Sequence, residues 1–307
     1  MTMKKANDSI SLAYYVVGFF DLLGQQDHLR NLRSLPNRND PEAIAETRDG
    51  LKNTYGAVVA MRQFFTDAFV AFERKTLDTS GLTPEQFSTY QQLTNNPIQL
   101  QGFSDSIAAY LSLTTNTAKL PARGVFGVFS AAATTFVCCL ARGHPIRGGI
   151  DVGIGFEPTD GEIYGPALSR AYTLESKIAN YPRIVVGDEL IRYLHKTREQ
   201  SADDAFAAAS KKTAATCLDS IAVDDDGYPF IDYLGPLFRA QFGNVIDPTV
   251  IDLAYDHVAE FSIRFKDSKD TKLAFRYALL RNYFEARLPL WSDLPRKTSK
   301  DEWRRCR

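Results

Sequence analysis

The chain has 307 residues, and its 36 lysines and arginines balance 37 aspartates and glutamates to a net charge of −1. This length suggests one large domain or two small ones. The hydrophobic content of 44% is ample for a globular core. The balanced charge argues against a protein whose main task is to bind nucleic acid or an anionic membrane.

The cysteines and the N-terminus indicate the compartment. None of Cys138, Cys139, Cys217 and Cys306 has the two-residue spacing of a zinc site, which favours a reducing environment. The first residues lack the apolar core of a signal peptide. The longest apolar run, 125–140, is shorter than the roughly twenty residues that a membrane-spanning helix needs. We therefore expect a soluble, cytoplasmic protein.

The first strong element is a predicted strand over residues 14–23. Its β-branched and aromatic residues are typical of a buried strand, and it ends in Asp21 just before Gly24. A buried carboxylate is costly unless something pairs with it. A divalent cation is a natural partner because hard cations bind carboxylate and carbonyl oxygens. Many strands nevertheless end in an aspartate that only caps the next turn.

A second carboxylate lies in a predicted hairpin. Residues 98–103 and 107–113 are typical of two strands, with a tight turn at 104–106 that places Asp105 at the tip. If this hairpin pairs with the first strand, Asp105 and Asp21 face one another and can bind one or two Mg²⁺ or Mn²⁺ ions. The alternative is that the two aspartates are unrelated in space.

Several helices are predicted around these strands. Pro41 opens a long helix that runs to about Lys75, although Gly50 and Gly56 weaken it. A shorter helix starts at Thr83 and continues through Leu93. Residues 125–140 have no polar face, which is typical of a buried helix.

The rest of the chain alternates between both kinds of element. Residues 144–156 form a strand whose glycines let another backbone or a ligand come close. Helices are predicted at 167–179, 188–194, 202–217, 248–264 and 271–286, a strand at 181–187 and a hairpin at 221–234, before a frayed tail. The acidic turn 224–226 lacks the spacing of a calcium loop, so we expect a solvated turn.

The order strand, helix, hairpin, helix, strand predicts the fold class. It indicates an α+β protein with a βαββαβ core, related to the ferredoxin-like plan, with additional helices.

Four blocks in this order resemble the class III nucleotide cyclase catalytic domain, and more closely the bacterial pyrimidine cyclases of Pycsar anti-phage defence. Phe19-Phe20-Asp21-Leu22-Leu23-Gly24 is similar to the family's first metal motif, and Phe103-Ser104-Asp105-Ser106 to its second. Residues 147–153 resemble the following strand, and 165–171 with 182–184 resemble the next helix and exit strand. The resemblance implies a cyclase domain over 1–200 and a C-terminal extension over 201–307, packed on the same domain.

The chain also departs from the family pattern. Its two aspartates are 84 residues apart, more than in ordinary class III domains. Gln101 stands where purine cyclases carry a base-reading lysine, and Glu162 takes the paired acidic position. Ser169 and Thr173 replace the usual asparagine and arginine. These differences match a pyrimidine cyclase better than an adenylate or guanylate cyclase.

The resemblance implies conversion of UTP to 3′,5′-cyclic UMP and pyrophosphate, with CTP and cyclic CMP as the alternative. The implied ligands of two Mn²⁺ or Mg²⁺ ions are Asp21, Asp105 and the carbonyl of Leu22. The amides of Leu23 and Gly24 are implied to hold the triphosphate. The cation on the transferring phosphate is Arg170, with Arg147 and Lys177 as alternatives.

The implied substrate contacts also include Phe19, Gln101, Glu162 and Ser169. Tyr55 would narrow the base pocket for a single ring, or it packs in the core with Leu51 and the neighbouring valines. Gln101 offers both a donor and an acceptor to a pyrimidine edge, or it is a surface residue without a role.

The family forms head-to-tail homodimers with two shared active sites, so the resemblance implies the same assembly here. Its product would activate a separate cyclic-nucleotide-sensing effector during phage infection. The alternative of another class is a catalytically silent module that binds nucleotide. The retention of Asp21 and Asp105 argues against this alternative, whereas Ser169 and Thr173 favour it.

Overall fold

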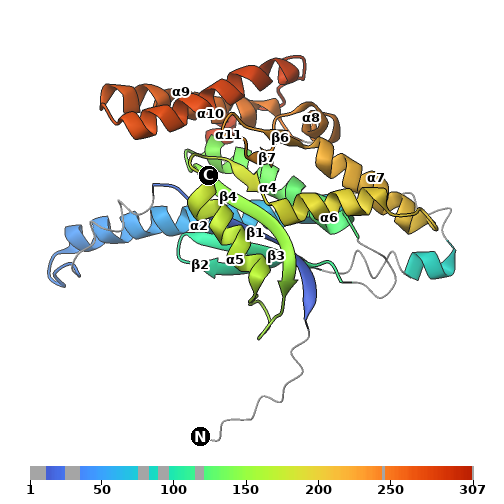
Figure 1. Ribbon diagram of the computed structural model, residues 1–307. Coiled ribbons are helices and arrows are strands. Elements are labelled where there is room, and N and C mark those ends of the chain that lie inside the picture. Colours follow the sequence, from blue (N-terminus) through green and yellow to red (C-terminus); the bar gives the residue numbers. More distant parts are fainter. Residues whose placement is uncertain are drawn as a thin grey trace, which may run out of the picture.

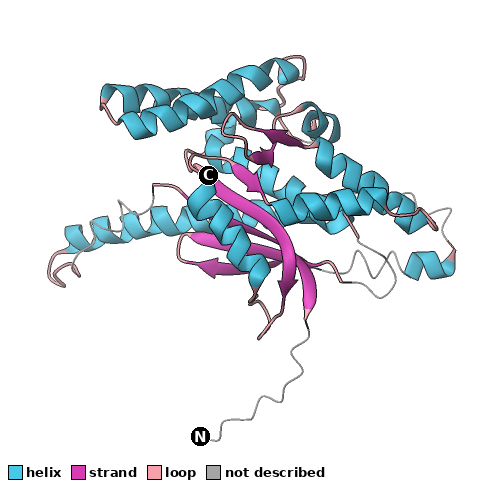
Figure 2. Ribbon diagram, in the orientation of Figure 1, coloured by secondary structure: helices cyan, strands magenta, loops and turns pink. Residues whose placement is uncertain are grey.

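The computed structural model describes residues 12–24, 35–74, 83–88, 97–114, 121–243 and 246–305. In this part of the chain seven strands form one sheet in the order β2-β3-β1-β4-β5-β7-β6 (Figures 1 and 2). The strands are β1 (Ala13–Leu22), β2 (Gln99–Phe103), β3 (Ser106–Ser112), β4 (Ile146–Gly155), β5 (Ile184–Val186), β6 (Ile221–Val223) and β7 (Pro229–Ile231).

The first four strands have the predicted topology. β1 lies between β3 and β4 and is antiparallel to both, and β2 pairs with β3 as a hairpin. With the helices that connect them, these strands form the βαββαβ arrangement of the ferredoxin-like plan. The predicted α+β fold class is therefore confirmed.

Helices cover the two faces of the sheet unequally. They are α2 (Pro41–Arg74), α4 (Arg123–Ala141), α5 (Pro166–Thr173), the π-helix η1 (Leu174–Ile178), α6 (Asp188–Glu199), α7 (Ala205–Asp219), α8 (Pro236–Phe242), α9 (Pro248–Asp267), α10 (Thr271–Arg287), the 3₁₀-helix η2 (Leu288–Trp291) and α11 (Lys300–Arg305). A short helical turn also begins at Pro84, while Lys75 and Leu93 lie outside the described residues.

The two faces carry different cores because side chains alternate along a strand. Val16 and Phe20 of β1 join a large core with α2 and α4, in which Phe20 contacts Phe65 of α2. Val17 and Phe19 point to the other face and join a smaller core with α5. The smaller core leaves part of this face open, and the candidate site lies there.

α2 is continuous despite its two glycines, because its second half packs in the large core. Its first half extends beyond the sheet, as Figure 1 shows. Leu51, Tyr55 and Val59 are spaced four residues apart on this helix, and all three are exposed.

α4 is the centre of the large core. By length and composition it is apolar enough to cross a membrane, but 78% of its apolar window is buried inside the molecule. α2 packs on one side of it and α9 on another. This is the environment of a core helix in a soluble domain, and the sequence analysis predicted a buried helix at this place.

The acidic turn between β6 and β7 is exposed at residues 225–228, in agreement with the predicted solvated turn, but it also has a structural role that the sequence did not show. It binds the buried Arg183, which directly precedes β5 and pairs with Asp224 and Asp226. The hydroxyl of Tyr181 also donates to Asp224. A buried guanidinium requires such partners, so the turn anchors the C-terminal part to the sheet.

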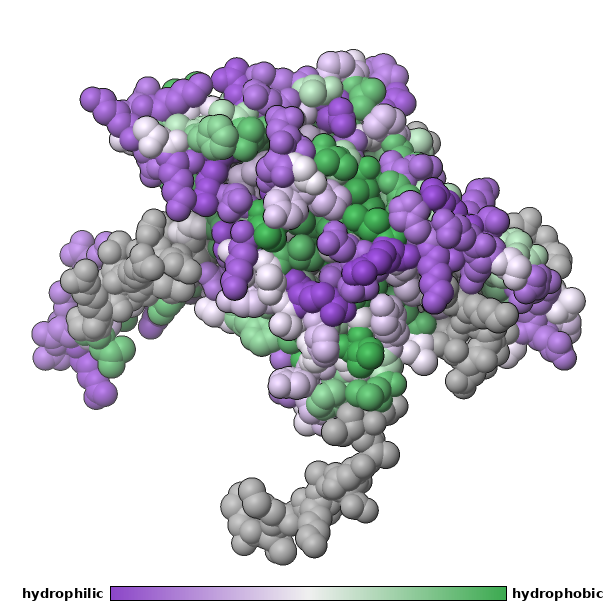
Figure 3. Space-filling view, viewed as in Figure 1, coloured by the Kyte–Doolittle hydropathy of each residue, from purple (hydrophilic) through white to green (hydrophobic). Residues whose placement is uncertain are grey.

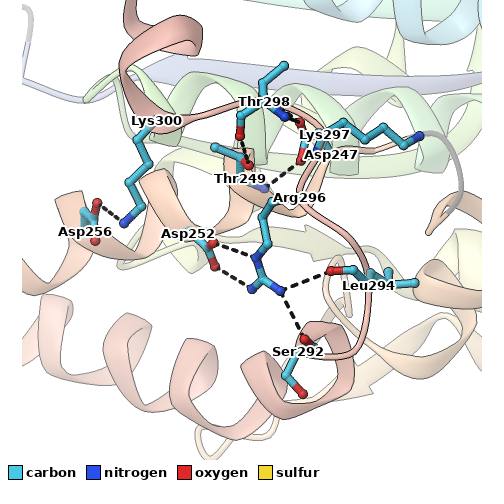
Figure 4. Close-up of polar contacts among 10 residues, drawn as sticks. All are labelled: Asp247, Thr249, Asp252, Asp256, Ser292, Leu294, Arg296, Lys297, Thr298 and Lys300. Atoms are coloured by element: carbon cyan, nitrogen blue, oxygen red, sulfur yellow. Dashed lines mark hydrogen bonds and ion pairs between the residues drawn. The ribbon is translucent and has the colours of Figure 1, made fainter.

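The predicted frayed tail is wrong, because the chain beyond α10 is folded against α9. Trp291 is buried and its Nε1 donates to the carbonyl of Leu234. Figure 4 shows two ion pairs between the tail and α9, one of Arg296 with Asp252 and one of Lys300 with Asp256. Figure 3 shows the resulting surface as largely hydrophilic over these C-terminal helices.

Candidate functional site

Asp21 occupies the end of β1 on the face that α5 leaves partly open. In the register of the sheet it lies between Ser106 of β3 and Arg147 of β4. The hydroxyl of Ser106 donates to Asp21 Oδ1 at 2.7 Å. The guanidinium of Arg147 lies 3.7 Å from Oδ2, which is an ion pair without a hydrogen bond.

Asp105 lies beside Asp21 at the tip of the β2–β3 hairpin. The turn requires Ser104 to adopt a positive φ of 52°, and the carbonyl of Asp105 accepts a hydrogen bond from the amide of Leu22 at 3.2 Å. Pairing of the hairpin with β1 thus brings together the two aspartates that the sequence analysis singled out. In the described part of the chain, the Asp105 carboxylate makes no hydrogen bond or ion pair.

The electrostatics of Asp21 follow from this crowding. Burial raises its pKa above the usual range, the Ser106 hydroxyl lowers it, the charge of Asp105 raises it again and Arg147 lowers it. The negative charge of Asp105 therefore opposes the ionisation of Asp21. A divalent cation between them would relieve this repulsion.

These residues fit a divalent metal. Among the described residues, no cluster of three or more histidine, cysteine, aspartate or glutamate side chains could hold an ion by itself. Mg²⁺ does not need one, because it is usually bound through one or two carboxylates together with water and substrate phosphates. The half-buried Asp21 and Asp105, with the backbone of Leu22 between them, are a donor set of this kind.

An aromatic groove of about 800 Å³ adjoins the aspartates. It is lined by Phe19, Phe103, Ser106, Tyr164, Gly165, Pro166, Leu168, Ser169, Arg170 and Tyr172. The ring of Phe19 contacts those of Phe103 and Tyr172 at centroid distances of 5.7 and 5.3 Å. Neither aspartate lines the groove, but Ser106 both lines it and donates to Asp21, so the groove lies next to this carboxylate.

Gln101 lies on the same face of the sheet, close to Glu162. Its Oε1 accepts a hydrogen bond from the amide of Ile163 at 2.9 Å, across 62 residues of sequence. Gln101 thus lies next to the segment that carries Glu162, but neither residue lines the groove, and their roles in reading a base stay predictions. Glu162 is exposed, and Ser169 lies in the groove wall.

Tyr55 does not line the groove. Its side chain is 67% exposed on α2, so it also does not pack in the core as the alternative proposed.

Arg170 lies away from the two aspartates. Its Nε pairs with Asp151 at 3.1 Å and its Nη2 donates to the carbonyl of Val152, so the guanidinium lies flat on β4 over Gly153. Asp151 is four residues beyond Arg147 along the strand, roughly 13 Å. The Arg170 side chain is still 38% exposed and also lines the groove. Its assignment as the cation at the reacting phosphate stays a prediction.

The other predicted phosphate contacts are divided. The sequence analysis expected the amide of Leu23 to hold the triphosphate. In the structure this amide instead donates to the carbonyl of Pro145 at 2.9 Å. Gly24 follows in the turn with a positive φ of 87°. Thr173 donates to the carbonyl of Ser169 within its own helix, and Lys177 is exposed.

Arg147 is the cation that does lie beside Asp21. Its Nε donates to Glu175, a side chain only 3% exposed in the π-helix η1. Burial and the positive charge of Arg147 lower the pKa of Arg276. Arg276 belongs to α10, so this helix of the C-terminal part lies near the same end of the sheet. Sequence reasoning did not assign a role to Ser106, Glu175 or Arg276. Of these three, only Ser106 could have been found from the sequence, because it directly follows Asp105 in the hairpin.

Comparisons with known proteins add one likeness. No protein-family model and no curated protein matches the sequence. Among solved structures, the adenylyl cyclase CyaB from P. aeruginosa is similar at 13% identity, over 61% of this chain and 82% of that chain, with a TM-score of 0.34.

Proposed function

We propose that this protein is a nucleotidyl cyclase that converts UTP to 3′,5′-cyclic UMP and pyrophosphate. One observation carries the proposal, namely the meeting of Asp21 and Asp105 next to an aromatic groove. Two adjacent carboxylates suit a nucleotide triphosphate bound through divalent ions, and aromatic rings suit a base.

The reaction forms one P–O bond and breaks one P–O bond and one O–H bond. The ribose 3′-hydroxyl loses its proton to solvent and its oxygen attacks the α-phosphorus, while the bond from the α-phosphorus to the bridging oxygen breaks and pyrophosphate leaves with that oxygen. Two Mg²⁺ or Mn²⁺ ions, when bound, lower the pKa of the 3′-hydroxyl and neutralise charge on the attacking and leaving oxygens. Asp21 and Asp105 would hold them, and Ser106 orients Asp21.

The other residues bind and orient the substrate. The rings of Phe19 and Tyr172 line the groove and offer apolar surface to a base. Arg147, the cation beside Asp21, can attract the negative phosphates.

Gln101 supports UTP over CTP. A backbone N–H only donates, so the bond from Ile163 fixes Oε1 as the occupied atom and leaves the NH₂ group of Gln101 for a substrate. Uracil carries an acceptor, O4, where cytosine carries a donor amino group. The orientation of the amide therefore favours a uracil edge.

A head-to-tail homodimer remains part of the proposal. The exposed stripe of Leu51, Tyr55 and Val59 on α2 is an apolar surface that no other described part of the chain covers. A second copy would cover it and would bring Tyr55 to the partner's groove. Action of the product on a separate effector, in defence against phage, also remains a prediction.

The test is to incubate the purified protein with each of the four nucleoside triphosphates and Mn²⁺ and to identify products by mass spectrometry. We expect cyclic UMP from UTP. Its rate should fall at least about 100-fold in a D21N/D105N double variant, since even the outer partners of a metal site cost 10–100-fold.

The control is E189Q, which changes an exposed carboxylate of α6 that pairs with Arg192. It should leave the rate unchanged. Cyclic AMP or cyclic GMP as the product would retain a cyclase but contradict the reasoning on Gln101. No product from any nucleotide, with UTP still bound in a calorimetric titration, would indicate the silent nucleotide-binding module instead.

A further inference from the structure

Glu175 is a buried carboxylate that the proposed reaction does not use directly. Its side chain is only 3% exposed, and burial raises its pKa while the hydrogen bond and charge of Arg147 lower it. The charges of Asp21 and Asp105 raise the pKa again, so three carboxylates lie in this region around Arg147. A π-helix at such a place is often associated with a functional site.

The packing of η1 on β4 explains why Glu175 reaches Arg147. A Cβ at Gly149 would lie 2.5 Å from the carbonyl oxygen of Ala171 and 2.7 Å from the amide of Glu175. Only glycine therefore lets the junction of α5 and η1 rest directly on this strand. Arg147 is two residues earlier on the same strand and points to the same face, where the Glu175 carboxylate meets it.

Arg147 is shared unequally between two carboxylates. Its Nε makes a hydrogen bond to Glu175 Oε1, whereas its Nη2 stays 3.7 Å from Asp21 Oδ2. Asp21 Oδ1 accepts the Ser106 hydroxyl. In the described part of the chain, Asp21 Oδ2 thus accepts no hydrogen bond and keeps a lone pair for a ligand.

We propose that Glu175 is a positioning residue for the candidate metal site. By holding Arg147 through a hydrogen bond, it keeps the guanidinium from closing on Asp21 and leaves one carboxylate oxygen to a divalent cation. Without this hold, Arg147 would form a close, charge-assisted pair with Asp21 and compete with the metal. This inference rests on the proposed function only in requiring that Asp21 and Asp105 bind a divalent cation.

The test measures Mn²⁺ binding to the full-length protein without nucleotide, from the electron paramagnetic resonance signal of free Mn²⁺. E175D is the decisive variant, because it keeps the charge of Glu175 and shortens its reach by one methylene. We expect its dissociation constant for Mn²⁺ to rise about three- to tenfold, the effect of roughly 1 kcal/mol or slightly more. R147Q, which removes the competing cation, should bind Mn²⁺ as tightly as the wild type or more tightly.

The double variant R147Q/E175D separates positioning from direct charge effects. If Glu175 acts through Arg147, E175D should change Mn²⁺ binding little once Arg147 is gone. E189D is the matched control, since it shortens an exposed carboxylate of α6, and it should bind as the wild type does. Circular dichroism and the thermal midpoint of each variant establish that it is folded.

Two results would overturn the inference. One is an equal loss of Mn²⁺ affinity on E175D substitution in the wild-type and in the R147Q background, which would make Glu175 a ligand or a purely structural residue. The other is weaker Mn²⁺ binding in R147Q than in the wild type, which would make Arg147 a support of the site. Failure of the proposed function looks different, because D21N/D105N would then bind Mn²⁺ as the wild type does.

Discussion

At Gln101, a neighbouring backbone group decides which atoms of the side chain remain for a substrate. The amide of Ile163 takes Oε1, and the NH₂ group is left over. The same principle applies to Asp21, whose Oδ1 is taken by Ser106 while Oδ2 is left. The chemistry of both residues therefore depends on partners that lie far away in the sequence.

Replacing the free donor of Gln101 with an acceptor should change the preferred base. In Q101E the amide of Ile163 still finds an oxygen, but the other atom becomes an acceptor that suits the amino group of cytosine. We expect the preference for UTP over CTP, as a ratio of kcat/KM, to fall about tenfold, the value of one matched hydrogen bond. Both nucleotides in one reaction, with products separated by mass, give this ratio directly.

Q99E is the matched control for this experiment. Gln99 lies on the same strand and on the same face, two residues earlier, so it receives the same charge change. Its ratio of UTP to CTP should not change. An equal loss of both activities in Q101E would mean that Gln101 does not contact position 4 of the base.

At the scale of the element, the start of α9 is where the C-terminal tail is tied to the fold. Asp247 is the N-cap of α9 and accepts from the amide of Thr249 at 3.0 Å, as Figure 4 shows. The same carboxylate accepts from the hydroxyl of Thr298 at 2.6 Å and from its amide at 2.9 Å. Burial alone would raise the pKa of Asp247, but these hydrogen bonds outweigh it and lower the pKa to about 2.

Because the pKa of Asp247 is lower in the folded state, its stabilising effect is present above the unfolded value near 3.9 and is lost as the pH falls toward 2. D247A should lower the free energy of unfolding by about 1–2 kcal/mol at pH 6, the usual cost of an N-cap. Urea unfolding at pH 6 and at pH 3 measures the difference between the two proteins. The difference in the free energy of unfolding between wild type and D247A should be smaller at pH 3 than at pH 6. A difference independent of pH would contradict the role of the ionised carboxylate.

At the scale of the whole molecule, the C-terminal part completes the core of the sheet domain. One continuous apolar core runs from Val16 in β1 to Trp291 in η2. α9 packs on α4, and the side chain of His257 in α9 lies against Gly143 in the turn that leads to β4. The same turn binds Leu23 through Pro145, so the C-terminal helices brace the backbone next to Asp21.

Residues 1–200 alone should therefore not fold, although the sequence analysis assigned the cyclase domain to them and treated 201–307 as an extension packed on that domain. Removal of 201–307 would expose the apolar surface of α4 and leave the buried Arg183 without its two aspartates. We expect the fragment to be insoluble or to bind the dye ANS without a cooperative thermal transition, as loosely packed states do. A cooperative transition in the fragment would show that the first 200 residues are independent.

Local sequence alone determined the elements that carry the aspartates. The strand ending in Asp21, the hairpin with Asp105 and the buried helix at 125–140 were all predicted, because their periodicity, turn residues and apolar runs act over a few neighbouring residues. The glycines of β4 were also correctly expected to allow a close approach. The helix α8 was missed, since its seven residues are too few to show a period.

The tertiary structure decided which side chains act together. Arg147 and Glu175 are 28 residues apart, Gln101 and Ile163 are 62 apart, and Arg183 and Asp224 are 41 apart. Composition and spacing do not encode such pairs, because each charge has many possible partners until the sheet register and the helix packing bring one of them within a few ångströms. For this reason the sequence pointed to Asp21 and Asp105, while only the fold paired Arg170 with Asp151 and placed Arg147 beside the site.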